Sequence, residues 1–312
     1  MNFPEDSRLL VKVAHMYYEE GATQSQIADE VGVSRSLISK YLSKARELGI
    51  VEIVIHDDKI HPYRQLEGKI ERLYSLREVV CIPNLGGESS KSRLGAAASK
   101  YLLRVLKNGQ TVGVSAGTTL HEVAKSLTSP QSYPSVTFVP LVGGMGNERM
   151  DIHANHIVAQ LAERIQAQYK LLHAPVMVDS KEAKEIFMRQ NSILNVFELA
   201  TRSDIAIVGI GGTPEHSTMV NSYLGQDHKG YFDQGDVVGD ICYNFINKNG
   251  QAADSSWNEK IITLDLERLK EIPLVVGVAC GLEKVQAIKA SLEGKLIQVL
   301  ITDEETAQAL LD

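Results

Sequence analysis

The sequence of 312 residues has few cysteines, no long hydrophobic run and no overall excess of positive charge. Its three cysteines, Cys81, Cys242 and Cys280, cannot form a disulfide framework, and no CxxC pair or Cys/His spacing indicates zinc. No apolar run approaches the roughly 18–20 residues that a membrane span needs. The start, MNFPEDSRLL, lacks a basic stretch followed by an apolar core, so we expect no signal peptide and a cytoplasmic location. We expect no metal, cofactor or membrane partner.

The composition is that of a globular chain, with 44% hydrophobic and 23% charged residues, and the length suggests about two domains. A net charge of −7 argues against indiscriminate binding to nucleic acid. Between Val31 and Arg46, however, there are four cations and no acid. This local patch is the first feature that indicates a function.

The patch lies in a segment with an ordered series of helix signals. Arg8–Glu20 has the apolar spacing of an amphipathic helix and is followed by Gly21. Thr23 to Gln26 matches a capping box that would open a second, short helix. Gly32 then supplies a turn, and Ser34 can cap a third helix running to about Glu47. This order predicts a helix-turn-helix, followed by a short β-like wing at Val51–Ile55.

The third helix is divided into an apolar face and a face of hydroxyls and cations. Serines and Arg35 near its start are suited to base edges in a major groove, and the lysines further along to phosphates. The alternative is a small helical bundle whose charged face is only solvated. The predicted DNA-binding residues are Gln24, Ser34, Arg35, Ser36, Ser39, Lys40 and Lys44.

The chain is expected to divide into a DNA-binding domain (1–56), a linker with a connecting helix (57–76) and a larger domain (77–312). In the linker, Leu66, Ile70 and Leu73 form a short helical stripe. This stripe fits a connecting or dimer-contact helix and, equally, a helix that packs on the next domain.

From about Arg77, short β-branched runs alternate with helical stretches, which predicts an α/β domain with a largely parallel sheet. The expected strands are Val79–Ile82, Thr111–Val114, Val136–Leu141, Lys170–His173, Ile205–Ile210, Val237–Cys242, Leu274–Val278 and Leu296–Ile301. The expected helices include Ser92–Leu106, Leu120–Leu127, Asn155–Gln168 and Lys284–Leu292.

Several of these strands end in glycine and hydroxyl residues, at the sheet edge where α/β proteins bind ligands. The first such end, GVSAGTT from Gly113 to Thr119, opens a helix and offers amides, hydroxyls and a helix dipole to an anion. An ordinary glycine turn with a capping threonine explains it equally well. Two more ends carry Gly143-Gly144 and Gly211-Gly212, and Asp240 and Lys284 follow later strands. Asp240 can accept from sugar hydroxyls, or simply cap a turn; Lys284 can face an anion, or be solvated.

Together these motifs (the helix-turn-helix, then GVSAGTT, PLVGG, DIAIVGIGG, VVGDIC and a late Gly-x-x-Lys) resemble the SorC family of bacterial transcriptional regulators. The resemblance covers about Arg8 to Leu311. It implies a Rossmann-like effector domain similar in fold to sugar-phosphate isomerases and deaminases, without their catalysis. It also implies operator DNA, a sugar, polyol or sugar-phosphate effector, and a homodimer or homotetramer.

Carried over to this chain, the resemblance implies an effector site made of Gly113, Ser115, Gly117, Thr118, Thr119, Gly143, Gly144, Gly211, Asp240 and Lys284. One departure concerns the residue before Gly143, where family members that hold a second phosphate or a covalent sugar carry Arg or Lys. Here it is Val142, which can do neither. We therefore expect a neutral or monophosphorylated sugar or polyol, bound noncovalently.

The predicted function is regulation of a carbohydrate-utilisation operon, with no enzymatic activity. The alternative is a sugar-phosphate isomerase or deaminase with an appended helical domain, which has no use for residues 21–49. A serine hydrolase is not expected, since GVSAG only loosely matches GxSxG.

Overall fold

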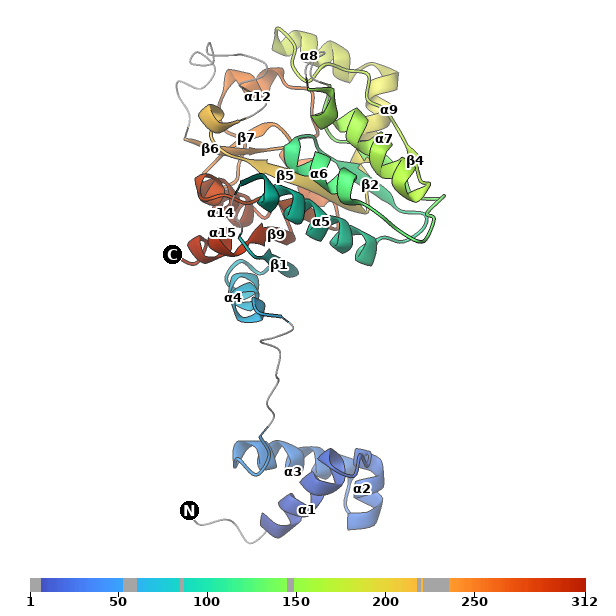
Figure 1. Cartoon of the computed structure of the whole chain (residues 1–312), viewed down its shortest axis with the longest axis vertical. Coiled ribbons are helices and arrows are strands. Elements are labelled where there is room, and N and C mark those ends of the chain that lie inside the picture. Colours follow the sequence, from blue (N-terminus) through green and yellow to red (C-terminus); the bar gives the residue numbers. More distant parts are fainter. Residues whose placement is uncertain (1–6, 53–60, 85–86, 145–148, 218–219, 221–235) are drawn as a thin grey trace. The chain divides into compact units, whose positions relative to one another are not determined.

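The computed structural model describes residues 7–52, 61–84, 87–144, 149–217, 220 and 236–312. The chain forms two compact units, one up to Ile60 and the other from His61 to the end. No helix among the described residues is long and apolar enough to cross a membrane. The prediction of a smaller helical unit followed by a larger α/β unit is confirmed (Figure 1).

The first unit is a bundle of three helices, α1 (Ser7–Tyr18), α2 (Gln24–Val31) and α3 (Arg35–Glu47), packed around Val13, Ile27 and Ile38. The predicted capping box is present, because Thr23 Oγ1 accepts from the Gln26 amide and Gln26 Oε1 accepts from the Thr23 amide. Of the predicted wing, Val51 and Glu52 are not in a strand, and residues 53–55 lie outside the described residues.

The second unit contains a sheet in the order β1-β9-β8-β5-β2-β3-β4, in which every neighbouring pair is parallel. A hairpin of β6 and β7 joins β5 in antiparallel fashion. The strands are β1 (Glu78–Ile82), β2 (Thr111–Val114), β3 (Thr137–Pro140), β4 (Gln168–Tyr169), β5 (Ile205–Gly211), β6 (Val237–Ile241), β7 (Asn244–Asn247), β8 (Val275–Val278) and β9 (Val299–Asp303).

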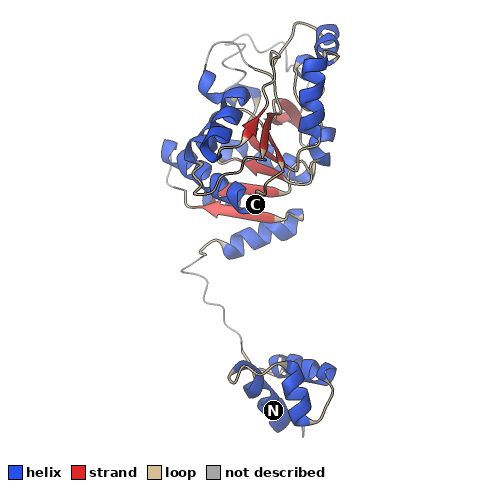
Figure 2. Cartoon of the chain, turned by 90° about the vertical axis from the view of Figure 1, so that its right-hand side faces the viewer, coloured by secondary structure: helices blue, strands red, loops and turns tan. Residues whose placement is uncertain are grey.

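Helices cover both faces of this sheet, and each face has its own apolar core (Figures 1 and 2). On one face lie α5 (Gly87–Val105), α6 (Thr118–Ser126) and α7 (Ala154–Ile165). The other core includes residues of α4 (Arg64–Tyr74), α9 (Asn191–Thr201), α12 (Ser256–Lys260), α13 (Leu266–Glu271), α14 (Val285–Glu293) and α15 (Glu304–Ala309). The unit also contains α8 (Lys181–Met188) and the short 3₁₀ turns η1 (Met150–Ile152), η2 (Pro214–His216) and η3 (Leu282–Lys284).

Of the two alternatives for the Leu66–Leu73 stripe, the structure shows packing on the larger unit. Ile70 is fully buried in its core, and α4 contacts β1 and α15. Leu73 remains exposed.

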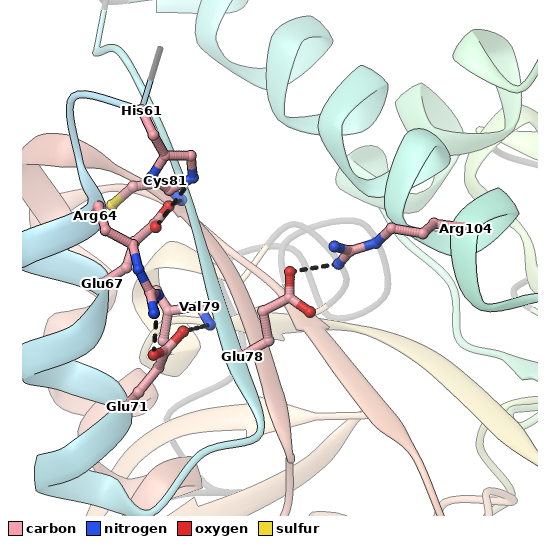
Figure 3. A network of polar contacts seen from close by, with 8 residues as sticks. All are labelled: His61, Arg64, Glu67, Glu71, Glu78, Val79, Cys81 and Arg104. Atoms are coloured by element: carbon pink, nitrogen blue, oxygen red, sulfur yellow. Dashed lines mark hydrogen bonds and ion pairs between the residues drawn. The ribbon is translucent and has the colours of Figure 1, made fainter. Parts of the chain in front are cut away.

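Helix α4 also covers the outer edge of β1, which is the end strand of the sheet among the described residues (Figure 3). The backbone amides of Val79 and Cys81 donate to carboxylate oxygens of Glu71 (3.1 Å) and Glu67 (2.8 Å). These glutamates, one helical turn apart, stand where the carbonyls of another strand would be. His61 and Arg64 pair with the same two carboxylates.

Three strand predictions are wrong: one strand is absent, one starts later than expected, and one is the first arm of a hairpin. Lys170–His173 is not a strand, because the backbone of Leu172 is held at both its N–H and C=O by the Asn155 side chain. The last strand, β9, runs to Asp303 and starts three residues later than expected. The run predicted as Val237–Cys242 is the first arm of a hairpin, whose second arm, β7, was not predicted.

Candidate functional site

Helix α3 exposes the polar face that was predicted to contact DNA. Its cap residue Ser34 and the residues Arg35, Ser36, Ser39, Lys40 and Lys44 are all exposed. The opposite face buries Ile38, Leu42 and Ala45 in the helical bundle. Gln24, at the start of α2, is half-buried.

The exposed side chains of α3 are not equally available to a ligand. Lys44 Nζ lies 2.9 Å from Glu47 Oε2, whereas Arg35 and Lys40 make no ion pair within the described residues. The Ser34 hydroxyl accepts from the Leu37 amide at 3.3 Å and thus caps the helix. The cations least engaged within the protein are therefore Arg35 and Lys40.

The larger unit contains a cleft beyond the carboxyl ends of β2 and β5. These strands are neighbours in the sheet, but the chain leaves them toward opposite sides, β2 to β3 and β5 to β8. Such a switch point leaves a crevice that α/β proteins use for ligands. The cleft encloses about 630 Å³, including space open to solvent. Its lining comes from residues 115–119 and 209–212, from Asp240, Cys242 and Tyr243, and from Ile152, Ser217 and Lys284.

One side of the cleft has the features of an anion site. Gly117 precedes α6 with φ 117°, a backbone conformation that favours glycine, and α6 has no side-chain cap. Among the residues that the structure describes, nothing accepts from the first amides of α6, which leaves them for an outside acceptor, as at many phosphate sites. Thr118, Thr119 and the half-buried Lys284 line the same cleft. Ser115 lines it too, but its buried hydroxyl accepts from the Gly209 amide at 3.2 Å.

Asp240 is the one acidic side chain among the described residues that line the cleft. Burial raises the pKa of its carboxyl to about 6, against the opposing effects of the Lys284 charge and a hydrogen bond from the Tyr243 amide. Burial thus makes the charged form of Asp240 costly, and the Lys284 charge offsets part of this cost. A buried acceptor of this kind is suited to hydroxyl groups that a bound ligand would bring.

Asp240 is held by a strained turn. Cys242 and Tyr243 join β6 to β7 and have φ of 52° and 63°, where Asn-Gly is the usual pair. Three side chains hold the turn's carbonyls. Thr263 Oγ1 donates to Cys242 O at 2.7 Å, Asn244 Nδ2 to the same oxygen at 3.3 Å, and Trp257 Nε1 to Tyr243 O at 3.0 Å. Strain of this kind concentrates at functional sites.

The structure brings seven of the ten predicted effector residues into this cleft and leaves three outside its lining. Gly113 lies inside β2, where a Cβ would meet Leu141. Gly143 and Gly144 pair with the chain at Ala174–Val176, and a Cβ on Gly143 would lie 2.4 Å from the Pro175 carbonyl oxygen. Close packing explains the glycine at positions 113 and 143, whereas Gly144 has only an ordinary contact with the Ala174 carbonyl oxygen at 3.8 Å. A role of these three residues in the effector site stays a prediction. Val142 is buried in the core and does not line the cleft either.

Sequence reasoning missed several lining residues, notably Ile152, Ser217, Cys242 and Tyr243. Ile152 and Ser217 follow no strand end, and no residue pattern marks them. The turn at Cys242 was hidden because it lacks the glycine typical of a two-residue hairpin.

Comparisons with known proteins match both units of the chain. Residues 58–312 match the family model "Putative sugar-binding domain", and residues 15–52 match a winged helix-turn-helix DNA-binding family. The chain is 30% identical to the sorbitol operon regulator of Klebsiella pneumoniae over the full length of both. It is 30% identical to the deoxyribonucleoside regulator of Bacillus subtilis, over 99% of this chain and 98% of that one. The crystal structure of the full-length Klebsiella regulator superimposes with a TM-score of 0.77, covering 99% of this chain and 100% of that one.

Proposed function

The chain belongs to the SorC family of sugar-binding transcriptional regulators, and on that premise we propose that a neutral or monophosphorylated sugar or polyol, bound noncovalently in the cleft, controls its binding to operator DNA. Under this proposal the operon serves carbohydrate utilisation and the protein acts in the cytoplasm, where its operator would be.

The observation that carries the proposal is the pairing of an uncapped helix N-terminus with a cation and a buried acceptor in one cleft. The amides of α6, with Thr118 and Lys284, would hold an anionic group. Asp240, with its amide donor from Tyr243, would accept from hydroxyls. A sugar monophosphate offers both groups in one molecule.

The charge of the lining argues for a single phosphate. Among the described lining residues, Lys284 is the one cation. Val142 adds none, since its side chain is apolar and lies in the core. A bisphosphate would therefore bring a second group of negative charge without a partner.

The helix-turn-helix is proposed to act in a homodimer or homotetramer. Paired recognition helices bind half-sites about one helical turn apart or multiples of it, so one helix per operator would lose most of the affinity. An effector controls such binding when it prefers one arrangement of the subunits, because equal affinity for both arrangements shifts nothing.

A thermal-shift screen of sugars, polyols and their phosphates tests this function. A specific ligand raises the melting temperature through mass action. We expect a response to one neutral sugar, polyol or sugar monophosphate. If it is a monophosphate, Lys284→Met should lower its affinity by about 30-fold or more, as expected for losing one partner of a desolvated charge pair. Lys170→Met, at an exposed lysine beside β4, is the matched control and should change nothing.

Tight binding of a sugar bisphosphate, or a sugar adduct trapped by borohydride, would contradict the proposed effector class. Turnover of sugar phosphates by the purified protein would instead revive the isomerase or deaminase alternative. The relatives found here are named as regulators, which argues against it.

A further inference from the structure

Helix α15 lies between the cleft and α4, the helix that follows the connection from the DNA-binding unit. It contacts η3, which ends in Lys284, and also β9, β1 and α4. These segments all belong to the larger unit. The contacts at the two sides of α15 are specific hydrogen bonds.

On the side of the cleft, α15 holds the turn that carries Lys284. The Gly281 amide donates to Thr306 Oγ1 at 2.8 Å, and Thr306 is fully buried. Gly281, with φ 115°, begins the turn, and the Lys284 amide donates back to its carbonyl at 3.0 Å. Thr306 is itself fixed, since its amide donates to Asp303 Oδ1 at 2.9 Å.

On the other side, α15 is hydrogen-bonded to α4 at two places, start to start and end to end. Tyr63, the residue before α4, donates its hydroxyl to Glu304 Oε2 at 3.1 Å, at the start of α15. Tyr74, the last residue of α4, donates to the carbonyl of Leu310 at 3.2 Å, just after α15. A shift of α15 would therefore move α4 as a whole rather than bend one end of it.

We propose that α15 couples the cleft to α4, with Thr306 as a positioning residue for Lys284 and with Tyr63 and Tyr74 passing the shift of α15 to α4. The inference rests on the proposed function, because it assumes an anion at Lys284. An anion that draws Lys284 toward α6 pulls on Gly281 and hence on Thr306. Helix α4 is the first helix after the segment that leads from the DNA-binding unit. A movement of α4 would therefore act directly on that segment.

Hydrogen exchange of the full chain during titration with inorganic phosphate tests the coupling, with sodium chloride of equal ionic strength as the reference. Two segments are followed in the same samples: residues 112–121 report occupancy of the cleft, and residues 63–75 report α4. In the wild-type chain we expect both to change with the same midpoint.

Three variants separate the roles. Tyr63→Phe combined with Tyr74→Phe should keep the midpoint of the cleft segment within about twofold, because neither hydroxyl lines the cleft, and should abolish the response of α4. Thr306→Val should weaken phosphate binding about tenfold, the effect of one buried hydrogen bond, while Thr306→Ser should restore it. Tyr169→Phe, which removes an exposed tyrosine hydroxyl elsewhere, is the matched control and should behave as wild type.

Three results would overturn the inference. The first is an α4 segment that does not respond in the wild-type chain although the cleft segment does. The second is an α4 response that survives in the double tyrosine variant. This result is decisive even if the Thr306→Val variant does not fold. The third is a cleft segment that does not respond to phosphate at all; this result contradicts the anion site of the proposed function and removes the premise of the inference with it.

Discussion

The DNA-binding surface and the cleft differ in how their residues are brought together. The surface of α3 comes from one helix of 13 residues, and the side chains predicted to contact DNA are exposed and close together in sequence. The cleft is built from segments between residues 115 and 284, and several of its members are buried. The polar side chains of the first site lie on the outer face of a helix whose folding does not depend on them. In the second, the functional groups are part of the core, so they affect the stability of the fold.

Asp240→Asn should have the largest effect on stability, and should measure how much the buried carboxylate destabilises the fold. The folded pKa of Asp240, about 6, lies above its ordinary value of 3.8. The folded chain therefore holds this proton more tightly than the unfolded chain, and wild-type stability falls as the pH rises from about 4 to about 6. We expect the variant to be more stable by about 3 kcal/mol above pH 6 and equal to wild type below pH 4.

Urea unfolding followed through Trp257, the single tryptophan, measures this difference in the larger unit at pH 8 and pH 4. The exposed Asp179→Asn is the matched control and should show no such gain. The same Asp240→Asn variant should bind the effector more weakly, because an amide replaces a charged acceptor. A variant that is no more stable at pH 8 than at pH 4, relative to wild type, would mean that Asp240 is not a desolvated carboxylate.

Substitutions on α3 should change DNA binding by a similar or smaller amount and leave stability unchanged. Arg35→Ala should lose about 1–3 kcal/mol of discrimination at particular bases. Lys40→Ala should weaken binding to every sequence and reduce the slope of its salt dependence by about one. Lys44→Ala should have a smaller effect of the same kind, because Lys44 is already paired with Glu47.

Titrations of the promoter DNA of its own gene and of random DNA, at several salt concentrations, distinguish these roles. Lys12→Ala, on α1 and paired with Glu30, serves as the control. If Arg35→Ala weakens binding to random DNA and promoter DNA equally, then Arg35 contacts phosphate and the assignment of roles along α3 is wrong.

Thr23→Ala should have the smallest effect, limited to the first unit. It removes the hydroxyl that caps α2 and should destabilise this unit by about 1 kcal/mol. Hydrogen exchange of the α2 amides detects the change, and Ser25→Ala, at an exposed serine that is not the cap, is the comparison. Any change in effector-induced thermal shift would show that the two units are coupled even without DNA.

The same contrast explains how much the sequence could predict. The helix-turn-helix is specified by contacts within a few residues, such as Thr23 with Gln26 and Ser34 with Leu37, so its bounds followed from the sequence. The parallel sheet also followed, because buried strands and amphipathic helices alternate. The hairpin of β6 and β7 did not, since its turn at Cys242 is held by distant side chains such as Thr263.

Glycine was the weakest guide to the cleft. Gly117 is required by its backbone angle at the start of α6, and Gly211 by the closeness of the Asp240 carboxylate. Gly143 looks the same in sequence, but it serves a close approach to the backbone of Pro175. Glycine marks a place where something comes close, and the tertiary structure decides whether that is a ligand or another strand.

The glutamates of α4 have a practical consequence for work on fragments of this protein. A fragment that starts at residue 77, at the beginning of the α/β pattern, would uncover the amides of Val79 and Cys81 along the whole outer margin of β1. Exposed edge strands form hydrogen bonds with strands of other chains, so we expect such a fragment to precipitate or form fibres. A fragment that starts at His61 retains α4, which covers the edge of β1, and should stay in solution.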